Sequence, residues 1–153
     1  MGKGCIKLKI LLKIAYDGAN YCGWQYQPNV NTVEAELSKA LSKTYKQKIK
    51  LRGASRTDTG VNALAQHATF EIEKSVIPLC RVPQVVNKLL PPDIVLMNAV
   101  EVAEIFDARY DAEEKIYRYC IQNSENVNPI FRNFTYCVRK PLEIGRASCR
   151  ERV

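Results

Sequence analysis

Apolar and polar residues alternate along several short stretches of the chain, with the period of a half-buried strand. The clearest stretch is IKLKILLKIAY, residues 6–16, which the turn residues Asp17 and Gly18 end. Residues 48–54 alternate again, and two further strands are predicted over residues 65–72 and 94–102. The pattern therefore predicts short strands, the first of them with one wetter face.

Two segments place their apolar residues at helical intervals instead. The first begins where Asn31 and Glu34 stand at capping-box spacing. Its apolar positions are Val33, Leu37, Ala40, Leu41 and Tyr45. The second begins at Pro83 and runs through Leu90, where a pair of prolines stops it. The order strand, helix, strand, strand, helix, strand predicts an α+β fold, a ferredoxin-like split βαβ unit with an antiparallel sheet.

The rest of the chain predicts further structure and an unusual end. Residues 115–121 and 134–138 are typical of two more strands, which either extend the sheet or start a second domain. We expect a ferredoxin-like domain over residues 1–105 and the truncated start of a second, similar domain over 106–142. The last residues, EIGRASCRERV from 143 to 153, lack periodicity and resemble translated sequencing-adapter DNA. We expect this tail to be non-native and the natural protein to continue beyond it.

Composition excludes several classes of protein. Of the 153 residues, 46% are hydrophobic and 25% are charged, which is ordinary for a globular protein. No apolar stretch approaches the roughly 20 residues of a membrane helix, and the N-terminus lacks the apolar core of a secretion signal. One histidine and six cysteines without a C-x-x-C pair build no plausible metal or Cys-His site. We therefore expect a cytoplasmic protein with reduced cysteines and no metal.

The net charge adds a hint about partners. The chain carries a formal charge of +7. Removing residues 143–153 leaves 20 basic residues (23 minus 3) and 14 acidic ones (16 minus 2), so the remainder is still +6. Clustered Lys and Arg favour a polyanionic partner because they release counterions from a phosphate backbone. Many basic proteins bind no such partner, so the net charge indicates a polyanionic partner only together with a candidate binding site.

The first candidate site is the segment SRTDTG, residues 55–60, between two predicted strands. In an extended backbone, residues i and i+2 point to the same side, so Arg56 is placed to pair with Asp58. The pairing would keep Asp58 ionised, as a nucleophile or base requires. Asp and Gly are also common in surface turns, and from the motif alone the turn is the stronger interpretation.

A second candidate is the glycine-punctuated segment YDGANYCGWQYQP, residues 16–28. Its Tyr21, Trp24 and Gln25 suit looped RNA, where rings stack on bases and amides bind base edges. The alternative, that the rings anchor the loop to the core, is at least as strong for Trp24.

A third candidate is FDARYDAEEKIYRY, residues 106–119. In the strand predicted from Lys115, alternation places Lys115 and Tyr117 on one face and Arg118 on the other, which gives a stacking ring beside a phosphate contact. Cross-strand packing of the tyrosines is an equal alternative. The only histidine, His67, lies in a strand pattern, and we interpret it as structural.

Taken together and in this order, these segments resemble the TruA family of tRNA pseudouridine synthases. The resemblance covers essentially all of residues 11–140. It comprises IAYDGANYCGWQYQP with the Thr32-Val33-Glu34 that follows, then SRTDTGVNALAQ, LLPPDI and FDARYDAEEKIYRY. Several ordered motifs at the family's spacing are far more specific than any one of them.

The resemblance implies an enzyme that isomerises uridine to pseudouridine in the tRNA anticodon arm, as a homodimer and without metal or cofactor. By position, the family's catalytic aspartate falls on Asp58, and the basic residue two before it falls on Arg56. The tyrosine that stacks on the target base falls on Tyr117. The arginine of the family's F-H-A-R segment, which contacts RNA or braces the site, falls on Arg109. Weaker RNA contacts are expected from Tyr21, Trp24, Gln25, Lys115 and Arg118.

The sequence also departs from the family. Members usually have Ala and His where this chain has Thr59 and Asn62, and His where it has Asp107, so tRNA contacts around the loop are expected to differ. A later family segment, which closes the cleft and completes the dimer, is absent from this sequence. Two alternatives therefore stand beside the enzyme: an inactive truncated fragment, and a non-catalytic RNA-binding module. The module would need aromatic RNP-type strands, and the sequence has none.

Overall fold

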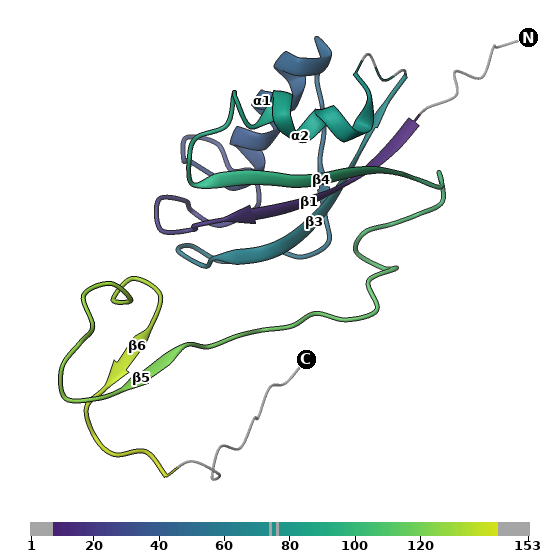
Figure 1. Cartoon of the computed structure of the whole chain (residues 1–153). Coiled ribbons are helices and arrows are strands. Elements are labelled where there is room, and N and C mark those ends of the chain that lie inside the picture. Colours follow the sequence, from purple (N-terminus) through teal and green to yellow (C-terminus); the bar gives the residue numbers. More distant parts are fainter. Residues whose placement is uncertain (1–7, 74, 76, 144–153) are drawn as a thin grey trace, which may run out of the picture. The chain divides into compact units, whose positions relative to one another are not determined.

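The computed structural model describes residues 8–73, 75 and 77–143. The chain, drawn in Figure 1, divides into two compact units, residues 1–113 and 114–153. The tail expected over residues 143–153 lies outside the described residues, apart from Glu143. Within the described part, no helix is long and apolar enough to cross a membrane.

The first unit is built on a four-stranded antiparallel sheet. Its strands lie in the order β2-β3-β1-β4 and are β1 (Leu8–Tyr16), β2 (Arg52–Gly53), β3 (Ala63–Ile72) and β4 (Ile94–Val102). The alternation of the sequence explains β1, in which Ile10, Leu12 and Ile14 are buried while Lys13 is exposed. This strand order, with one helix after β1 and another after β3, confirms the predicted ferredoxin-like α+β fold.

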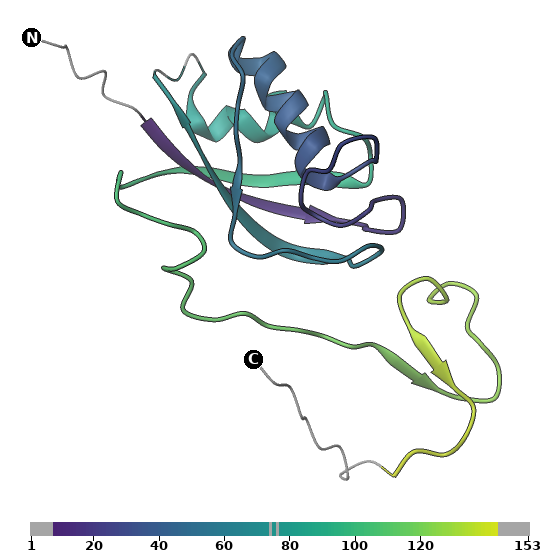
Figure 2. The ribbon, with the colours of Figure 1, turned by 180° about the vertical axis from the view of Figure 1, so that it is seen from behind.

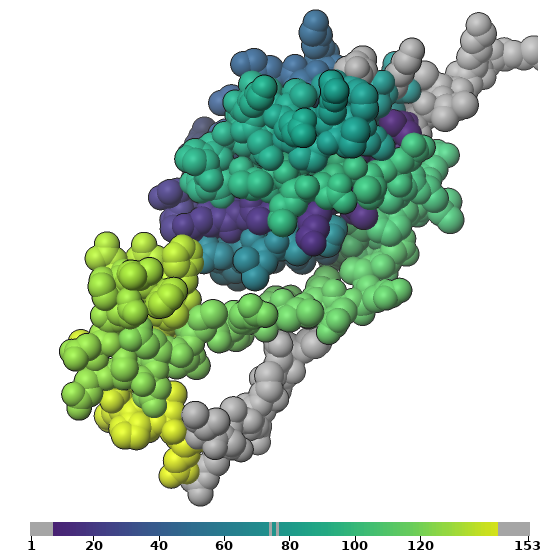
Figure 3. Space-filling model, viewed as in Figure 1, coloured from purple at the N-terminus to yellow at the C-terminus, as the bar shows by residue number. Residues whose placement is uncertain are grey.

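Both helices lie on one face of this sheet (Figures 1 and 2). They are α1 (Val33–Tyr45) and α2 (Val82–Val86), the latter preceded by the 3-10 turn η1 (Leu79–Arg81). The space-filling view shows the helices, β4, β1 and β3 packed in succession (Figure 3). Fully burying one aliphatic side chain contributes roughly 1.5–3 kcal/mol. The core between the layers therefore dominates the stability, and it includes Ile10, Leu12, Ile14, Leu37, Leu41, Phe70, Val82, Val86, Ile94 and Leu96.

The start of α1 differs from the prediction in its capping residue. Thr32, not Asn31, is the N-cap, and its hydroxyl accepts from the amide of Ala35 at 3.4 Å. The carboxylate of Glu34 accepts from the amide of Tyr26 instead, at 2.7 Å. Glu34 therefore ties the preceding loop to the helix rather than closing a capping box. Threonine and asparagine are both good caps, so sequence spacing did not distinguish them.

Two other elements are shorter than predicted. The helix expected over residues 83–90 covers only Val82–Val86, because the Asn87 side chain exchanges two hydrogen bonds with the backbone of Leu96 in β4. The strand expected over residues 48–54 is reduced to Arg52–Gly53. At Ile49, just before it, the amide donates to the Ser42 hydroxyl of α1 at 2.9 Å rather than to a strand. Hydrogen bonds with neighbouring elements therefore override both local patterns.

The second unit contains a two-stranded parallel sheet, β5 (Ile121–Asn123) with β6 (Tyr136–Val138). The strands expected over residues 115–121 and 134–138 were therefore predicted too long. Hydrogen bonding to the other strand begins only at Cys120, whose carbonyl oxygen accepts from the Tyr136 amide at 2.8 Å. A strand forms only where a neighbour satisfies its backbone groups, and β propensity does not replace that neighbour.

Candidate active site

The connection between β2 and β3, residues 54–62, carries Asp58 at an exposed position. Its second half is a tight turn in which the Val61 amide donates to the Asp58 carbonyl oxygen at 3.2 Å. Gly60 within this turn has a φ of +77°, a conformation that glycine adopts readily. The turn therefore explains the glycine of the motif, and it leaves the Asp58 carboxylate open to solvent.

A second loop, residues 17–31, fixes the backbone around Asp58. The amide of Trp24 donates to the Thr57 carbonyl oxygen at 3.0 Å, and the Gly60 amide donates to the Tyr21 carbonyl oxygen at 3.3 Å. The Thr57 hydroxyl also lies 2.7 Å from the Tyr16 hydroxyl at the end of β1. Because these bonds bracket Asp58 in sequence, its backbone is positioned by the folded core, as catalysis by an oriented group requires.

Glycine residues allow the two loops to approach so closely. A Cβ atom at Gly23 would lie 2.4 Å from the Thr57 carbonyl oxygen, and Gly23 has a φ of +83°. A Cβ atom at Gly18 would lie 2.1 Å from the Val61 carbonyl oxygen. Any side chain at either position would push the aspartate loop away, so the Gly-punctuated segment is a requirement of loop packing.

The aromatic residues of this loop are part of the core. Trp24 is 2% exposed, its ring centroid lies 6.0 Å from that of Tyr16, and it packs against Gly53 of β2. Tyr21 is 3% exposed, and its hydroxyl donates to the Asp93 carboxylate at 2.6 Å. Burial, with Asp93 as the next cause, raises the pKa of Tyr21 well above its usual value. In this structure both rings anchor the loop, while Gln25 is exposed.

A small recess lies beside these loops and holds two of the predicted arginines. Arg56 and Arg109 line it together with Arg52, Gln25 and the Glu34 carboxylate. Arg56 and Arg109 come from segments far apart in the sequence, and both are exposed. Their shared recess is therefore a product of the fold, and it offers guanidinium donors suited to phosphate or carboxylate oxygens.

The expected ion pair between Arg56 and Asp58 is not formed. Among residues that the structure describes, the ion pairs are Lys9 with Glu71 and Arg52 with Asp107. The backbone turns at Asp58 instead of continuing as a strand, so the i, i+2 geometry on which the expectation rested does not apply.

The remaining predicted residues lie in the second unit. Lys115, Tyr117 and Arg118 are all exposed, and Tyr117 has 65% of its surface accessible. They belong to the segment without strand pairing, so the predicted alternation of faces does not describe them. The Tyr117 ring is accessible within its unit, as a ring that stacks on a base must be.

Sequence reasoning missed several residues that hold the site together. The Asn62 side-chain oxygen accepts from the Gly18 amide at 2.7 Å, which joins the two loops a third time. Lys9, Arg52 and Asp107 form contacts that place the segment carrying Arg109. Asp107 and Asn62 are both departures from the family pattern, which was the available signal. Lys9 and Arg52 gave none, because their partners are distant in sequence.

The fold and the site together define a class: an α+β protein that presents one carboxylate and several arginines beside a ferredoxin-like sheet. A sequence model of the family described as tRNA pseudouridine synthase matches residues 13–111, which contain this whole arrangement. The chain belongs to the tRNA pseudouridine synthase family.

Individual relatives agree with this assignment. Over 135 residues the chain is 44% identical to the tRNA pseudouridine synthase A of a Thermoanaerobacter species, covering 88% of this chain and 55% of the relative. Over 137 residues it is 47% identical to that of Ruminiclostridium cellulolyticum, covering 90% and 56%. The Brachyspira hyodysenteriae protein of the same name is 38% identical over 131 residues, covering 86% and 53%. The chain therefore spans about half the length of the curated relatives it matches.

Proposed function

We propose that this chain carries the catalytic aspartate of a tRNA pseudouridine synthase, which isomerises uridine in the anticodon arm. The names of its relatives support the activity and the substrate. The structural observation that carries the proposal is the state of Asp58. Its carboxylate is exposed, while hydrogen bonds from an independent loop position the backbone on both sides of it. A carboxylate held in a fixed place on an exposed loop is expected of a catalytic group, because its orientation need not be found anew during the reaction.

The reaction breaks the bond between N1 of uracil and C1′, turns the base, and joins C1′ to C5. The C5 hydrogen leaves to solvent and N1 gains a proton, so there is no net change in atoms. The uridine must first leave its stack, which costs a few kcal/mol that an aromatic ring partly offsets. Tyr117 supplies that ring. Asp58 acts in the next step, as a nucleophile toward the ring or the sugar, or as a base toward the sugar.

The arginines and the net charge provide the tRNA contacts. Arg56 and Arg109 bind phosphate or orient the substrate in the recess that they share. Gln25, Lys115 and Arg118 are exposed and add weaker contacts. Tyr21 and Trp24 act indirectly, by holding the loop that positions Asp58. A charge of +7 favours association with the polyanionic tRNA.

The whole protein, in this proposal, is a cytoplasmic homodimer that uses neither metal nor cofactor. Its first domain spans residues 1–105, and residues 106–142 begin a second, similar domain. The tail over residues 143–153 is non-native. The alternatives to a catalytic protein are a non-catalytic RNA-binding module and an inactive fragment. The following experiment distinguishes catalysis at Asp58 from RNA binding without catalysis.

The experiment measures tritium release from tRNA labelled at C5 of uracil. Residues 11–140 replace the aligned segment of the Thermoanaerobacter relative, so that the site is tested within a chain of the relative's length. We expect release from this chimaera and none from its Asp58→Ala variant, with tRNA binding unchanged. A folded chimaera that binds tRNA without releasing tritium contradicts the proposal, as does equal release from both proteins.

A further inference from the structure

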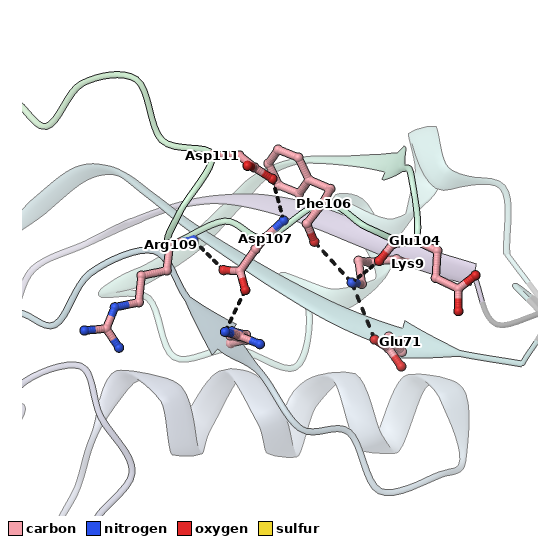
Figure 4. Close-up of polar contacts among 8 residues, drawn as sticks. Lys9, Glu71, Glu104, Phe106, Asp107, Arg109 and Asp111 are labelled. Carbon is pink, nitrogen blue, oxygen red and sulfur yellow. Dashed lines mark hydrogen bonds and ion pairs between the residues drawn. The ribbon is translucent and has the colours of Figure 1, made fainter.

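The segment that follows β4 is attached to the first unit at several points. We call residues 104–111 the strap (Figure 4). Near its start, the Lys9 ammonium donates to the carbonyl oxygens of Glu104 and Phe106, the latter at 3.1 Å. The same ammonium lies 3.7 Å from the Glu71 carboxylate of β3, and the Lys9 side chain is only 16% exposed. A half-buried lysine with three oxygen partners is a firm attachment for a segment without regular structure.

Asp107 makes the second attachment, and one carboxylate serves two partners. Its Oδ2 lies 2.6 Å from a guanidinium nitrogen of Arg52 in β2, and the Asp107 side chain is 19% exposed. Its Oδ1 accepts from the backbone amide of Arg109 at 2.9 Å. Asp107 therefore links an edge strand of the sheet directly to the backbone of Arg109. Asp111 closes the turn, since its carboxylate accepts from the Asp107 amide at 2.8 Å.

The aromatic ring of Tyr110 adds to this link. The Arg52 and Arg109 guanidinium carbons lie 5.9 Å and 5.8 Å from its centroid, within the range of cation–π attraction. Two like charges thus share one ring while Asp107 compensates the charge of Arg52. The hydrogen bond from Asp107 holds the backbone of Arg109, and its guanidinium lies beside Tyr110 at the recess that also contains Arg56.

We propose that Asp107 is a positioning residue that, through Arg52, holds Arg109 in the recess to contact a phosphate of the tRNA backbone. This inference rests on the proposed function, because it takes tRNA as the ligand. Family members usually have histidine at this position. A neutral imidazole has one acceptor nitrogen, whereas the carboxylate has two acceptor oxygens for the two partners seen here. The two contacts assign a role to the carboxylate of Asp107 in this chain.

The direction in which tRNA affinity changes when Asp107 loses its charge separates a positioning role from simple electrostatics. Asp107 is an acidic residue beside a cationic recess, so removing its charge strengthens the binding of any polyanion if charge alone matters. If Asp107 positions Arg109, the same change weakens binding because Arg109 loses its place. Glu104 provides the matched control, since it is an exposed acidic residue of the same strap whose carbonyl oxygen, rather than its carboxylate, binds Lys9.

The experiment measures the dissociation constant of an unmodified tRNA transcript from the 153-residue chain over a series of KCl concentrations. We expect Arg109→Ala and Asp107→Asn each to weaken tRNA binding roughly tenfold, which is the lower end of the range expected for the loss of one hydrogen bond to a charged group. Each also lowers the salt slope by about one. The double variant should be no weaker than either single one, and Glu104→Gln should bind as tightly as the wild type or more tightly. Circular dichroism and Trp24 fluorescence check that every variant is folded.

Four results would overturn the proposal. Asp107→Asn binding as tightly as Glu104→Gln would reduce Asp107 to an electrostatic role. Additive losses in the double variant would separate Asp107 from Arg109, and unchanged binding by Arg109→Ala would remove the contact itself. Failure of the proposed activity is distinguishable, because the binding differences do not depend on catalysis. A wild-type chain that binds no tRNA would overturn the inference about Asp107 alone, because the proposed activity is measured separately in the chimaera.

Discussion

Two segments that the sequence predicts as strands, one in each unit, have different structures. The largely apolar residues 94–102, which the sequence predicts as a strand, form β4, in which Ile94 and Leu96 are each 1% exposed. The alternating residues from 115 to 121 form a strand only at Ile121, and Ile116 is 78% exposed. The first pattern has β1 beside it and helices over one face, whereas the second is without such neighbours among the described residues. Alternation therefore specifies which face of a strand is buried, but a neighbouring strand decides whether the strand forms.

Truncating one phenylalanine in each unit tests this contrast with the largest effect. Phe70 is 2% exposed and packs 5.6 Å from the Tyr45 ring, whereas Phe134 is 53% exposed. Phe70→Ala should lower the free energy of unfolding by about 3–5 kcal/mol, and Phe134→Ala by about 0.5 kcal/mol or less. Urea unfolding followed by far-UV circular dichroism, which reports on the backbone of both units, measures both losses. Comparable losses would show that the second unit also has a core.

A pair of glycine substitutions tests how tightly the first unit holds the aspartate loop. Gly23→Ala strains a φ of +83° and brings Cβ to 2.4 Å from the Thr57 carbonyl oxygen, so we expect a loss of roughly 2–4 kcal/mol. Gly60→Ala strains a φ of +77° in open space and should cost roughly 1–2 kcal/mol. Equal costs in thermal unfolding would mean that the two loops separate easily.

A capping variant tests the helix start within the well-packed unit. Thr32 is fully buried and its hydroxyl accepts from the Ala35 amide, so Thr32→Ala should cost about 1 kcal/mol. Asn31→Ala is the matched control, because only the Asn31 carbonyl oxygen is used, by the Cys22 amide. A larger loss for Asn31→Ala would restore the capping residue that the sequence suggested.

Titration of His67 gives the smallest effect and reports on the partly covered face of the sheet. Burial, and then the charge of Lys13 opposite it in β1, lowers the pKa of His67 below its usual value of 6.5. The folded state therefore binds this proton less readily than the unfolded state, and stability falls slightly as the pH drops through about 6.5. NMR titration of the only histidine should find the lowered pKa, and Lys13→Ala should raise it only in part. A pKa of 6.5 or above would contradict the burial.

The sequence predicted the order of strands and helices along the chain, because each element has its own local periodicity. It also brought Asp58, Arg56 and Arg109 to attention, through the family resemblance. It left open whether Trp24 is buried and expected Tyr21 at RNA, whereas both are buried, because the interior and an RNA surface favour the same aromatic rings. It predicted an Arg56–Asp58 pair from extended backbone geometry, and the turn at Asp58 removed that geometry.

The contacts of the strap lay beyond prediction for a different reason. Lys9 and Arg52 reach partners 55 or more residues away, and only the folded sheet brings them together. The same holds for the recess, whose two arginines come from separate segments. Long-range placement is thus what the structure adds to the site, while the chemistry-bearing residues were visible in the sequence.

The most direct test that Asp58 is the catalytic group is the rate of tritium release by the chimaera when Asp58→Asn is the only change. Asparagine keeps the size of the side chain and the turn but removes the carboxylate. We expect the rate to fall by at least about a thousandfold, with tRNA affinity and thermal stability unchanged. Release within a few-fold of the unsubstituted chimaera would contradict the claim that Asp58 is the catalytic group.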